Sequence, residues 1–193
     1  MESGRVKKFG LRLIWLICRL SLISLLLGWT SDSTVVTRVW QSPYIGAQNL
    51  GKTLVLAYTL VPRPIVGGRV EQEWVMQLQD TGIDAHAWTA LGGMMGVPSM
   101  GEIRPLLRER GFDTLLVTQL LALKRINPNI RNAQVAVVET RLYSAPSDEV
   151  YWSVQSDTFL YKYSGDELRH PNERDLRDFV EVMIRTMSGN GVL

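Results

Sequence analysis

The sequence has few of the residues that build disulfide-linked or metal-centred proteins. Its 193 residues include one cysteine and two histidines. A single cysteine cannot form an intramolecular disulfide bond, and these three residues are too few for a structural zinc site of cysteine and histidine alone. His86 and His170 each have a single carboxylate neighbour, Asp84 or Glu173, which is too little for a metal site. We therefore expect neither a metal nor another cofactor.

Glycine, proline and excess charge of one sign are also scarce. The 16 glycines and 8 prolines are too few for a collagenous or low-complexity chain, and a hydrophobic fraction of 46% is too high for intrinsic disorder. Residues 1–29 hold five of the 21 basic and one of the 19 acidic residues, so the remainder is close to neutral. Without a Lys/Arg cluster it has no electrostatic footprint for nucleic acid. The composition is typical of a globular protein of one or at most two domains.

The first 32 residues have the pattern of a signal peptide or a weak N-terminal membrane anchor. Basic residues up to Arg19 precede a short apolar stretch, Leu20 to Leu27, and a polar run follows from Thr30. An arginine near the centre of a spanning helix costs roughly 2.5–3.5 kcal/mol, so a 20-residue span around Arg19 is a poor anchor. The pattern therefore favours a bacterial secretion signal, and the alternative is an amphipathic or buried helix of a cytosolic protein.

The end of this segment, Leu26-Leu27-Gly28-Trp29, resembles a bacterial lipobox. In a lipobox the small residue is followed by the cysteine that is lipidated. Trp29 occupies that position here and has no thiol, so lipidation does not carry over. We expect the N-terminal segment to engage the membrane, and the protein to be periplasmic or anchored in the inner membrane facing the periplasm rather than in the outer membrane. Whether the segment is cleaved is left open.

Residues 33–193 alternate between strand and helix patterns. β-Branched and apolar runs predict strands at 33–40, 53–60, 83–88, 112–123, 133–143 and 150–159. Helical periodicity predicts one helix that opens at Gly67-Gly68, one capped by Ser99 with Glu102, and one capped by Asn172. The order β-β-α-β-α-β-β-β-α predicts a single α/β domain in which helices pack on a mixed β-sheet.

The sequence offers no catalytic constellation. Ser99 lacks the glycine two positions earlier that a serine-hydrolase turn requires, and its capping role explains it better. Glu71, Glu73 and Asp80 lie along the first predicted helix, where a solvated face is expected. Because no nucleophile, base and orienting group occur together, we expect a protein that is not an enzyme.

Two loops form an alternative site. Loops 61–69 and 88–98 are expected at strand ends, where α/β sheets place ligands. Gly67-Gly68-Arg69 passes from a strand into a helix, a position that binds phosphate in nucleotide-binding folds. The Walker and dinucleotide spacings are absent, so a plain turn is favoured over an anion site. The alternative function is a small-ligand or anion-binding protein, or an enzyme.

Aromatic residues are the other candidates for binding. Trp74 and Trp152 lie at helix or strand spacing among apolar neighbours, which predicts that both are in the core. Trp88 and Tyr44 have less regular surroundings and are expected to form exposed contacts with a partner. With Arg69, they are the binding residues that the sequence predicts.

Several short segments of the body carry a resemblance to the small uncharacterised lipoproteins of the bacterial envelope. They are 37–44, 54–59, Arg69 with Glu71 or Glu73, 111–118, 139–143 and 150–153. The architecture is more distantly similar to lipoproteins that activate peptidoglycan synthases and to the N-terminal domain of the Tol-system propeller protein. Those proteins are binding modules. The resemblance therefore implies a non-enzymatic envelope protein that binds a protein partner in the envelope.

Overall fold

The computed structural model describes residues 33–43, 50–59, 64–93, 98–125, 133–161 and 172–193. The segment 1–32, with the lipobox-like residues 26–29, lies outside the described residues, as does Tyr44. The elements are β1 (Thr34–Gln41), β2 (Thr53–Thr59), α2 (Pro64–Asp80), β3 (Ala85–Ala87), the 3-10 turn η1 (Thr89–Leu91), α3 (Met100–Glu109), β4 (Thr114–Arg125), β5 (Ala133–Ser144), β6 (Val150–Tyr161) and α4 (Glu173–Gly189). This order confirms the one expected from the sequence.

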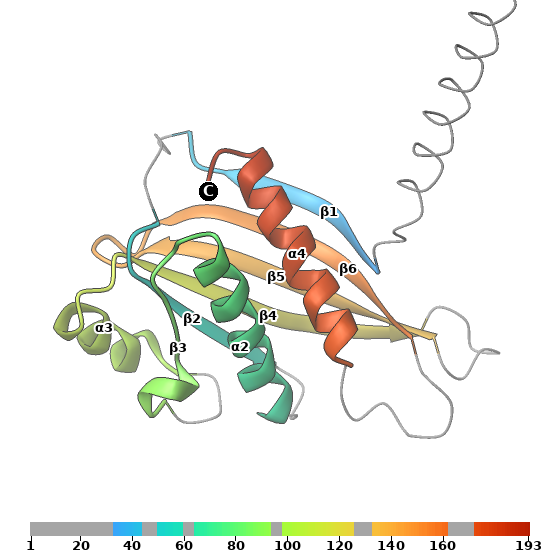
Figure 1. Cartoon of the computed structure of the whole chain (residues 1–193), viewed down its shortest axis with the longest axis horizontal. Coiled ribbons are helices and arrows are strands. Elements are labelled where there is room, and N and C mark those ends of the chain that lie inside the picture. Colours follow the sequence, from blue (N-terminus) through green and yellow to red (C-terminus); the bar gives the residue numbers. More distant parts are fainter. Residues whose placement is uncertain (1–32, 44–49, 60–63, 94–97, 126–132, 162–171) are drawn as a thin grey trace, which may run out of the picture. The chain divides into compact units, whose positions relative to one another are not determined.

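All six strands form one mixed sheet in the order β1-β6-β5-β4-β2-β3 (Figure 1). Strand β2 is parallel to both of its neighbours, β4 and β3. The pairs β4–β5, β5–β6 and β6–β1 are antiparallel. The predicted α/β class with a mixed sheet is therefore confirmed, and β1 and β3 are the two edges of the sheet.

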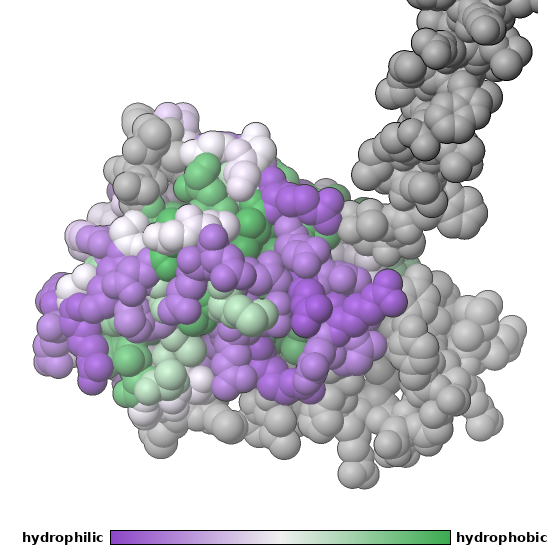
Figure 2. All heavy atoms as spheres, in the orientation of Figure 1, coloured by the Kyte–Doolittle hydropathy of each residue, from purple (hydrophilic) through white to green (hydrophobic). Residues whose placement is uncertain are grey.

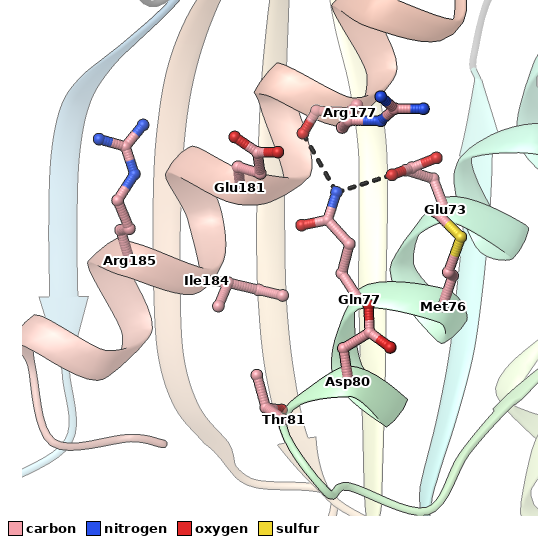
Figure 3. A pocket seen from close by; sticks show the side chains of 9 residues that line it. All are labelled: Glu73, Met76, Gln77, Asp80, Thr81, Arg177, Glu181, Ile184 and Arg185. Carbon is pink, nitrogen blue, oxygen red and sulfur yellow. Dashed lines mark hydrogen bonds between the residues drawn. The ribbon is translucent and has the colours of Figure 1, made fainter.

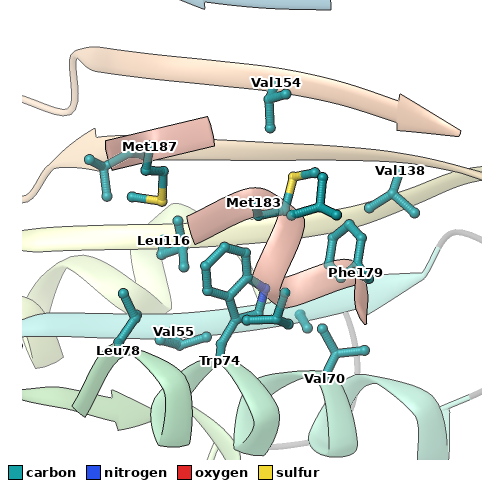
Figure 4. Packing of buried hydrophobic residues seen from close by; sticks show 14 of the residues in the cluster. Val55, Val70, Trp74, Leu78, Leu116, Val138, Val154, Phe179, Met183 and Met187 are labelled. Atoms are coloured by element: carbon teal, nitrogen blue, oxygen red, sulfur yellow. The ribbon is translucent and has the colours of Figure 1, made fainter. Parts of the chain in front are cut away.

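Helices α2 and α4 lie side by side on one face of the sheet and cover the main hydrophobic core (Figures 1 and 4). Helix α2 places Val70, Trp74 and Leu78, four residues apart, against the strands. The ring of Trp74 meets Phe179 of α4 edge to face at 6.3 Å between centroids. Trp152 of β6 is also fully buried, so both predicted core tryptophans are confirmed.

Helix α3 packs on the opposite face, over β2 and β4. Its buried residues Ile103 and Leu107 belong to a second hydrophobic cluster with Leu54 and Leu56 of β2. Successive β2 residues therefore face different helices, which explains the continuous apolar run in this strand. This second cluster contains no residue of β1 or β6.

Local capping signals are found at the starts of the helices. Ser99 and Glu102 form the predicted capping box of α3, and the Asn172 side chain accepts a hydrogen bond from the Asp175 N–H at 2.8 Å. Helix α2 begins at Pro64 rather than at Gly67, because proline is well suited to the first helical position. The expectation that Gly67-Gly68 opens this helix is therefore wrong.

Candidate functional site

The predicted loops do begin at one edge of the sheet. Since β2 and β3 are parallel neighbours, the segments that follow them start at the same, carboxyl-terminal edge. Residues 61–63 and 94–97 of these loops lie outside the described residues. Gly67, Gly68 and Arg69 do not form a loop at this edge, because they lie inside α2. A Cβ at Gly67 would lie 2.5 Å from the Ala57 carbonyl oxygen, so this glycine permits close contact between α2 and β2.

Glu71 occupies the place where an anion would bind. Its Oε1 accepts from the Ala57 N–H at 3.0 Å, and its Oε2 accepts from the Thr89 N–H at 2.9 Å and the Thr89 hydroxyl at 2.6 Å. The residue is 1% exposed, so the expectation that Glu71 lies on a solvated face is wrong. Because this carboxylate takes up the donors at the ends of β2 and β3, it acts as an internal substitute for an external anion.

Arg69 and Trp88 differ in their surroundings. Arg69 lies on α2 with its side chain 33% exposed, and its Nη2 is 3.6 Å from Glu173 Oε1 at the start of α4. Trp88 is only 9% exposed and belongs to the second hydrophobic cluster. Gly93 packs directly on the Trp88 ring, where a Cβ would clash. The prediction that Trp88 is exposed is therefore wrong, because the chain after β3 folds back over the indole.

The sheet face opposite α2 and α4 is covered by α3 only over part of β2 and β4. Strand β6 shows it most clearly: Trp152, Val154, Ser156 and Thr158 are buried, whereas the residues between them, on this face, are half-buried. Strand pairing aligns five polar side chains across it, from β1 to β2. They are Arg38, Gln155, Glu139, Gln119 and Tyr58. We call this row, together with Trp40, Arg141 and Tyr143, the open face.

The centre of the open face is held by charged and aromatic side chains. Arg141 Nη2 lies 2.8 Å from Glu139 Oε2, and Arg141 Nη1 donates to the Tyr143 hydroxyl at 3.4 Å. The Tyr58 hydroxyl donates to Gln119 Oε1 at 3.1 Å. The hydrogen bond with Tyr143 raises the pKa of Arg141, and burial is the main cause that raises the pKa of Tyr58. Arg141 is therefore charged and Tyr58 protonated at neutral pH.

Strand β1 forms the rim of the open face. Trp40, opposite Ser153, is 47% exposed, and Val35, opposite Asp157, is 51% exposed. Trp40, Arg141 and Tyr143 are not among the binding residues that the sequence predicts. The alternating pattern of residues 133–143 and 150–159 is the sequence signal that could have pointed to Arg141 and Tyr143, because it indicates strands with one polar face. The pairing of β1 with β6, which adds Trp40 to this face, has no local signal in the sequence.

A hollow lies between α2 and α4, on the side of the sheet opposite the open face (Figure 3). Its volume is about 460 Å³. Gln77 Nε2 bridges the two helices, because it donates to Glu73 Oε1 at 2.7 Å and to the Arg177 carbonyl oxygen at 3.2 Å. The surface around it is largely hydrophilic (Figure 2), and the lining combines carboxylates from both helices and guanidinium groups from α4 with the apolar Met76 and Ile184. This hollow therefore has the character of a solvated seam between helices.

Two kinds of feature are missing from the part of the chain that the structure describes. No group of three or more histidine, cysteine, aspartate or glutamate side chains is arranged to hold a metal ion there. No described helix combines the length and the apolar character needed to cross a membrane.

No protein-family model and no curated protein matches the chain. Solved structures are nevertheless similar in fold. The PelC dodecamer from Paraburkholderia phytofirmans, in two crystal forms, has TM-scores of 0.52 and 0.51 at 15% identity; the match covers 80% of this chain and 96% and 95% of the PelC chains.

Two further structures are similar at lower TM-scores. Lipoprotein GNA1162 from Neisseria meningitidis has a TM-score of 0.41 at 14% identity, covering 72% of this chain and 99% of that one. The LpoB C-terminal domain from Salmonella enterica has a TM-score of 0.36 at 11% identity, and the match covers 60% of this chain and 86% of that one. The structural neighbours thus include an envelope lipoprotein and the LpoB domain, in line with the expected resemblance, and the resemblance to the Tol-system protein stays a prediction. At these identities, the similarity with PelC establishes the fold alone.

Proposed function

We propose that this chain is an exported protein of the bacterial envelope that binds a protein partner through its open face, without catalysis. The observation that carries the proposal is the row of polar and aromatic side chains that pairs across five strands on the sheet face opposite α2 and α4, with its Tyr58 end packed against the cluster under α3. Trp, Tyr and Arg are the residues most enriched among those that dominate binding energy at protein interfaces. The open face carries Trp40, Tyr58, Tyr143, Arg38 and Arg141.

The shape of this surface also favours a protein over a small ligand. Small molecules bind in concave sites that enclose most of their surface, whereas the open face is one side of a sheet. The alternative small-ligand site at the carboxyl-terminal edge has less support, because Glu71 already accepts from Ala57 and Thr89 there. Polar side chains that hold one another in place, as Arg141 and Glu139 do, suit an interface that must also be soluble when unbound.

The envelope location rests on the N-terminal segment. Its basic residues, short apolar stretch and following polar run support export, and the resemblance of the body to envelope lipoproteins supports the same compartment. PelC, which shares the fold, is described as a dodecamer, so a chain of this fold can assemble through protein contacts.

Site-specific photo-cross-linking in cells tests the binding surface. A benzophenone amino acid is placed at Gln155, in the middle of the open face, or at Gln72, exposed on α2 on the opposite side. We expect a discrete adduct of higher mass from position 155 and none from position 72. Adducts from both positions, from neither, or only at twice the mass of the chain would contradict the proposal.

A variant connects the adduct with specific side chains. Replacing a residue that dominates an interface weakens binding by about 2 kcal/mol or more, roughly thirtyfold. We expect Arg141→Ala to remove most of the adduct formed from position 155. Arg177→Ala, which removes an arginine from the seam between α2 and α4, is the matched control and is expected to leave the adduct intact. Equal loss in both variants would count against the open face.

The location is tested by the intact mass of the protein in separated membrane and soluble periplasmic fractions. Loss of roughly 3 kDa from the 21.8 kDa chain, with the protein in the soluble periplasmic fraction, indicates a cleaved signal peptide and a free periplasmic domain. The full mass in the inner membrane indicates an uncleaved anchor that faces the periplasm. Recovery of the full-length protein from the cytosol would contradict export.

A further inference from the structure

Strand β1 concentrates the exposed apolar side chains of the molecule. Among the described residues, five large hydrophobic side chains are exposed, and three of them, Val35, Val39 and Trp40, lie on this strand. Within the described part of the chain β1 pairs with β6 alone, so its other edge carries backbone groups without a strand partner. An apolar edge of this length is a surface on which another strand can add.

The opposite edge of the sheet is built differently. Strand β3 has only three residues, and the Ala85 carbonyl oxygen accepts a hydrogen bond from Gln79 Nε2 at 3.0 Å. A short edge with a capped carbonyl is one way in which proteins prevent strand addition. Strand β1 has eight residues and a single charged side chain, Arg38. The two edges therefore differ in their capacity to accept a strand, and β1 is the one suited to it.

A bulge in β1 determines which side chains share a face. Val35 pairs with Asp157 and Trp40 with Ser153, and both therefore lie on the open face. The register shift between Val36 and Arg38 makes this possible, because residues five apart in a regular strand lie on opposite faces. For the same reason Val36 and Val39 share the face covered by helices.

The apolar residues of β1 are arranged symmetrically about its centre. The sequence Thr-Val-Val-Thr-Arg-Val-Trp-Gln has apolar residues at positions 35, 36, 39 and 40, with Thr37 and Arg38 between them. If two such strands run antiparallel about a twofold axis between 37 and 38, Val35 faces Trp40 of the second copy and Val36 faces Val39. Each pair then lies on one face of the joined sheet, and Arg38 faces Thr37 rather than a second arginine.

We propose that β1 pairs antiparallel with β1 of a second copy of this chain, in the register that sets residue 35 opposite residue 40. The two six-stranded sheets become one, and the open faces of both copies lie on the same side of it. The inference goes beyond the proposed function and does not depend on it. A second copy is the occupant that the strand itself specifies, because its apolar positions match their own twofold image and its single charge is set opposite a threonine rather than opposite itself.

The size of the contact determines the expected affinity. One eight-residue strand from each copy buries less surface than a standard protein interface, so we expect a dissociation constant on the order of micromolar rather than nanomolar. The dimer is therefore to be sought at high protein concentration, or trapped covalently.

Disulfide trapping tests the register. In full-length protein in mild detergent, with Cys18→Ser to remove the native thiol, Val35→Cys and Trp40→Cys are introduced together or singly. Directly opposite residues in an antiparallel pair lie about 5 Å apart between Cα atoms, within disulfide range. In the single variants the like cysteines are offset by five residues, roughly 15 Å. Dimers from the double variant alone are expected, whereas dimers from the single variants to the same extent, or none at all, would overturn the proposal.

A charge pair at Thr37 tests the dimer without removing its apolar contacts. Thr37 is exposed, and both replacements remove its hydroxyl, which donates to the Gln155 carbonyl oxygen. In the proposed register, Thr37→Glu sets a carboxylate opposite Arg38 twice, and Thr37→Arg sets like charges opposite each other twice. Sedimentation equilibrium is expected to show a dissociation constant lowered about threefold or more by Thr37→Glu and raised as much by Thr37→Arg. Equal effects of the two variants, or a monomer at all concentrations, would overturn it.

Discussion

At the scale of single residues, Glu71 has the most clearly defined structural role. Its buried carboxylate accepts three hydrogen bonds, from Ala57 and Thr89, and so connects α2 with the ends of β2 and β3. In Glu71→Ala, the buried Ala57 N–H and the partly buried Thr89 N–H and hydroxyl lose their acceptor, and each group left buried and unsatisfied costs about 1–3 kcal/mol. We expect the free energy of unfolding to fall by about 3 kcal/mol or more, as measured by urea titration.

The control for this prediction is the next residue in the helix. Gln72 is exposed on α2, and surface substitutions usually change stability by no more than about 0.5 kcal/mol. Gln72→Ala is therefore expected to unfold like the unchanged protein. A similar loss of stability in the Glu71 and Gln72 variants would show that the buried hydrogen bonds are not the cause.

Adjacent glycines in α2 provide a second residue-scale prediction. An added Cβ at Gly67 would lie 2.5 Å from the Ala57 carbonyl oxygen, whereas one at Gly68 would meet only the Thr89 side chain, with Cγ2 at 3.8 Å and Oγ1 at 3.9 Å. We expect Gly67→Ala to destabilise the protein by at least about 2 kcal/mol, because backbone must shift. Gly68→Ala is expected to stabilise it by up to about 1 kcal/mol through helix propensity. Thermal unfolding of both variants checks the opposite signs, and equal effects would contradict the close contact with β2.

The two side chains that the sequence wrongly predicted to be exposed, Glu71 and Trp88, share one physical cause. Glu71 and Trp88 are buried by segments that follow them in the chain and fold back, η1 onto the carboxylate and Gly93 onto the indole. Such contacts leave no periodic trace, since they depend on the path of a turn rather than on the spacing of side chains. Trp74 and Trp152 lie in regular elements, and periodicity alone placed them correctly in the core.

At the scale of elements, capping residues in the sequence predict where two of the helices begin. Asn172 and the Ser99–Glu102 pair cap helices through hydrogen bonds that reach three residues along the chain, so the sequence alone indicates them. Pro64 is a more ambiguous signal, because a proline can end a strand as well as begin a helix, and here it begins α2. Proline can thus end one element or start another, and only the residues that follow it in the sequence distinguish the two cases.

The first turn of α4 gives a prediction on pH. Burial is the main cause that raises the pKa of Asp175 above its ordinary value of 3.8, and the charge of Asp178 adds to this. Because the folded carboxyl holds its proton more tightly than the unfolded one, the free energy of unfolding falls as pH rises from below 3.8 through the raised pKa. Asp175→Asn lacks this titration, so its stability relative to the unchanged protein is expected to increase between about pH 3.5 and pH 7, measured by urea unfolding.

A substitution on the same helix controls for the loss of one negative charge. Glu181 is exposed on α4, and Glu181→Gln removes a charge without changing a buried group. We expect its stability relative to the unchanged protein to vary less with pH than that of Asp175→Asn. If both variants follow the same course, the raised pKa of Asp175 does not contribute to the pH dependence of folding.

At the scale of the whole molecule, the two faces of the sheet differ because the helices are unevenly distributed. Two helices cover one face, and α3 covers part of the other. The sequence predicts the elements and their order, but not the strand order β1-β6-β5-β4-β2-β3, because pairing of β1 with β6 joins residues more than 110 positions apart. The open face depends on that pairing. Its residues were therefore predicted only as the polar side of separate strands.

This uneven distribution also predicts which part of the molecule opens first. Helix α4 buries seven residues, including Phe179, Val180 and Met183, whereas α3 buries only Ile103 and Leu107 and contains Pro105, which lacks an N–H. Local opening requires less free energy where fewer apolar contacts are lost. In native-state hydrogen exchange, we expect the amides of α3 to exchange through a smaller opening that leaves α4 and β4 protected. If α3 and α4 exchanged with the same opening free energy, the two clusters would form one cooperative unit, and the second face would be as stable as the first.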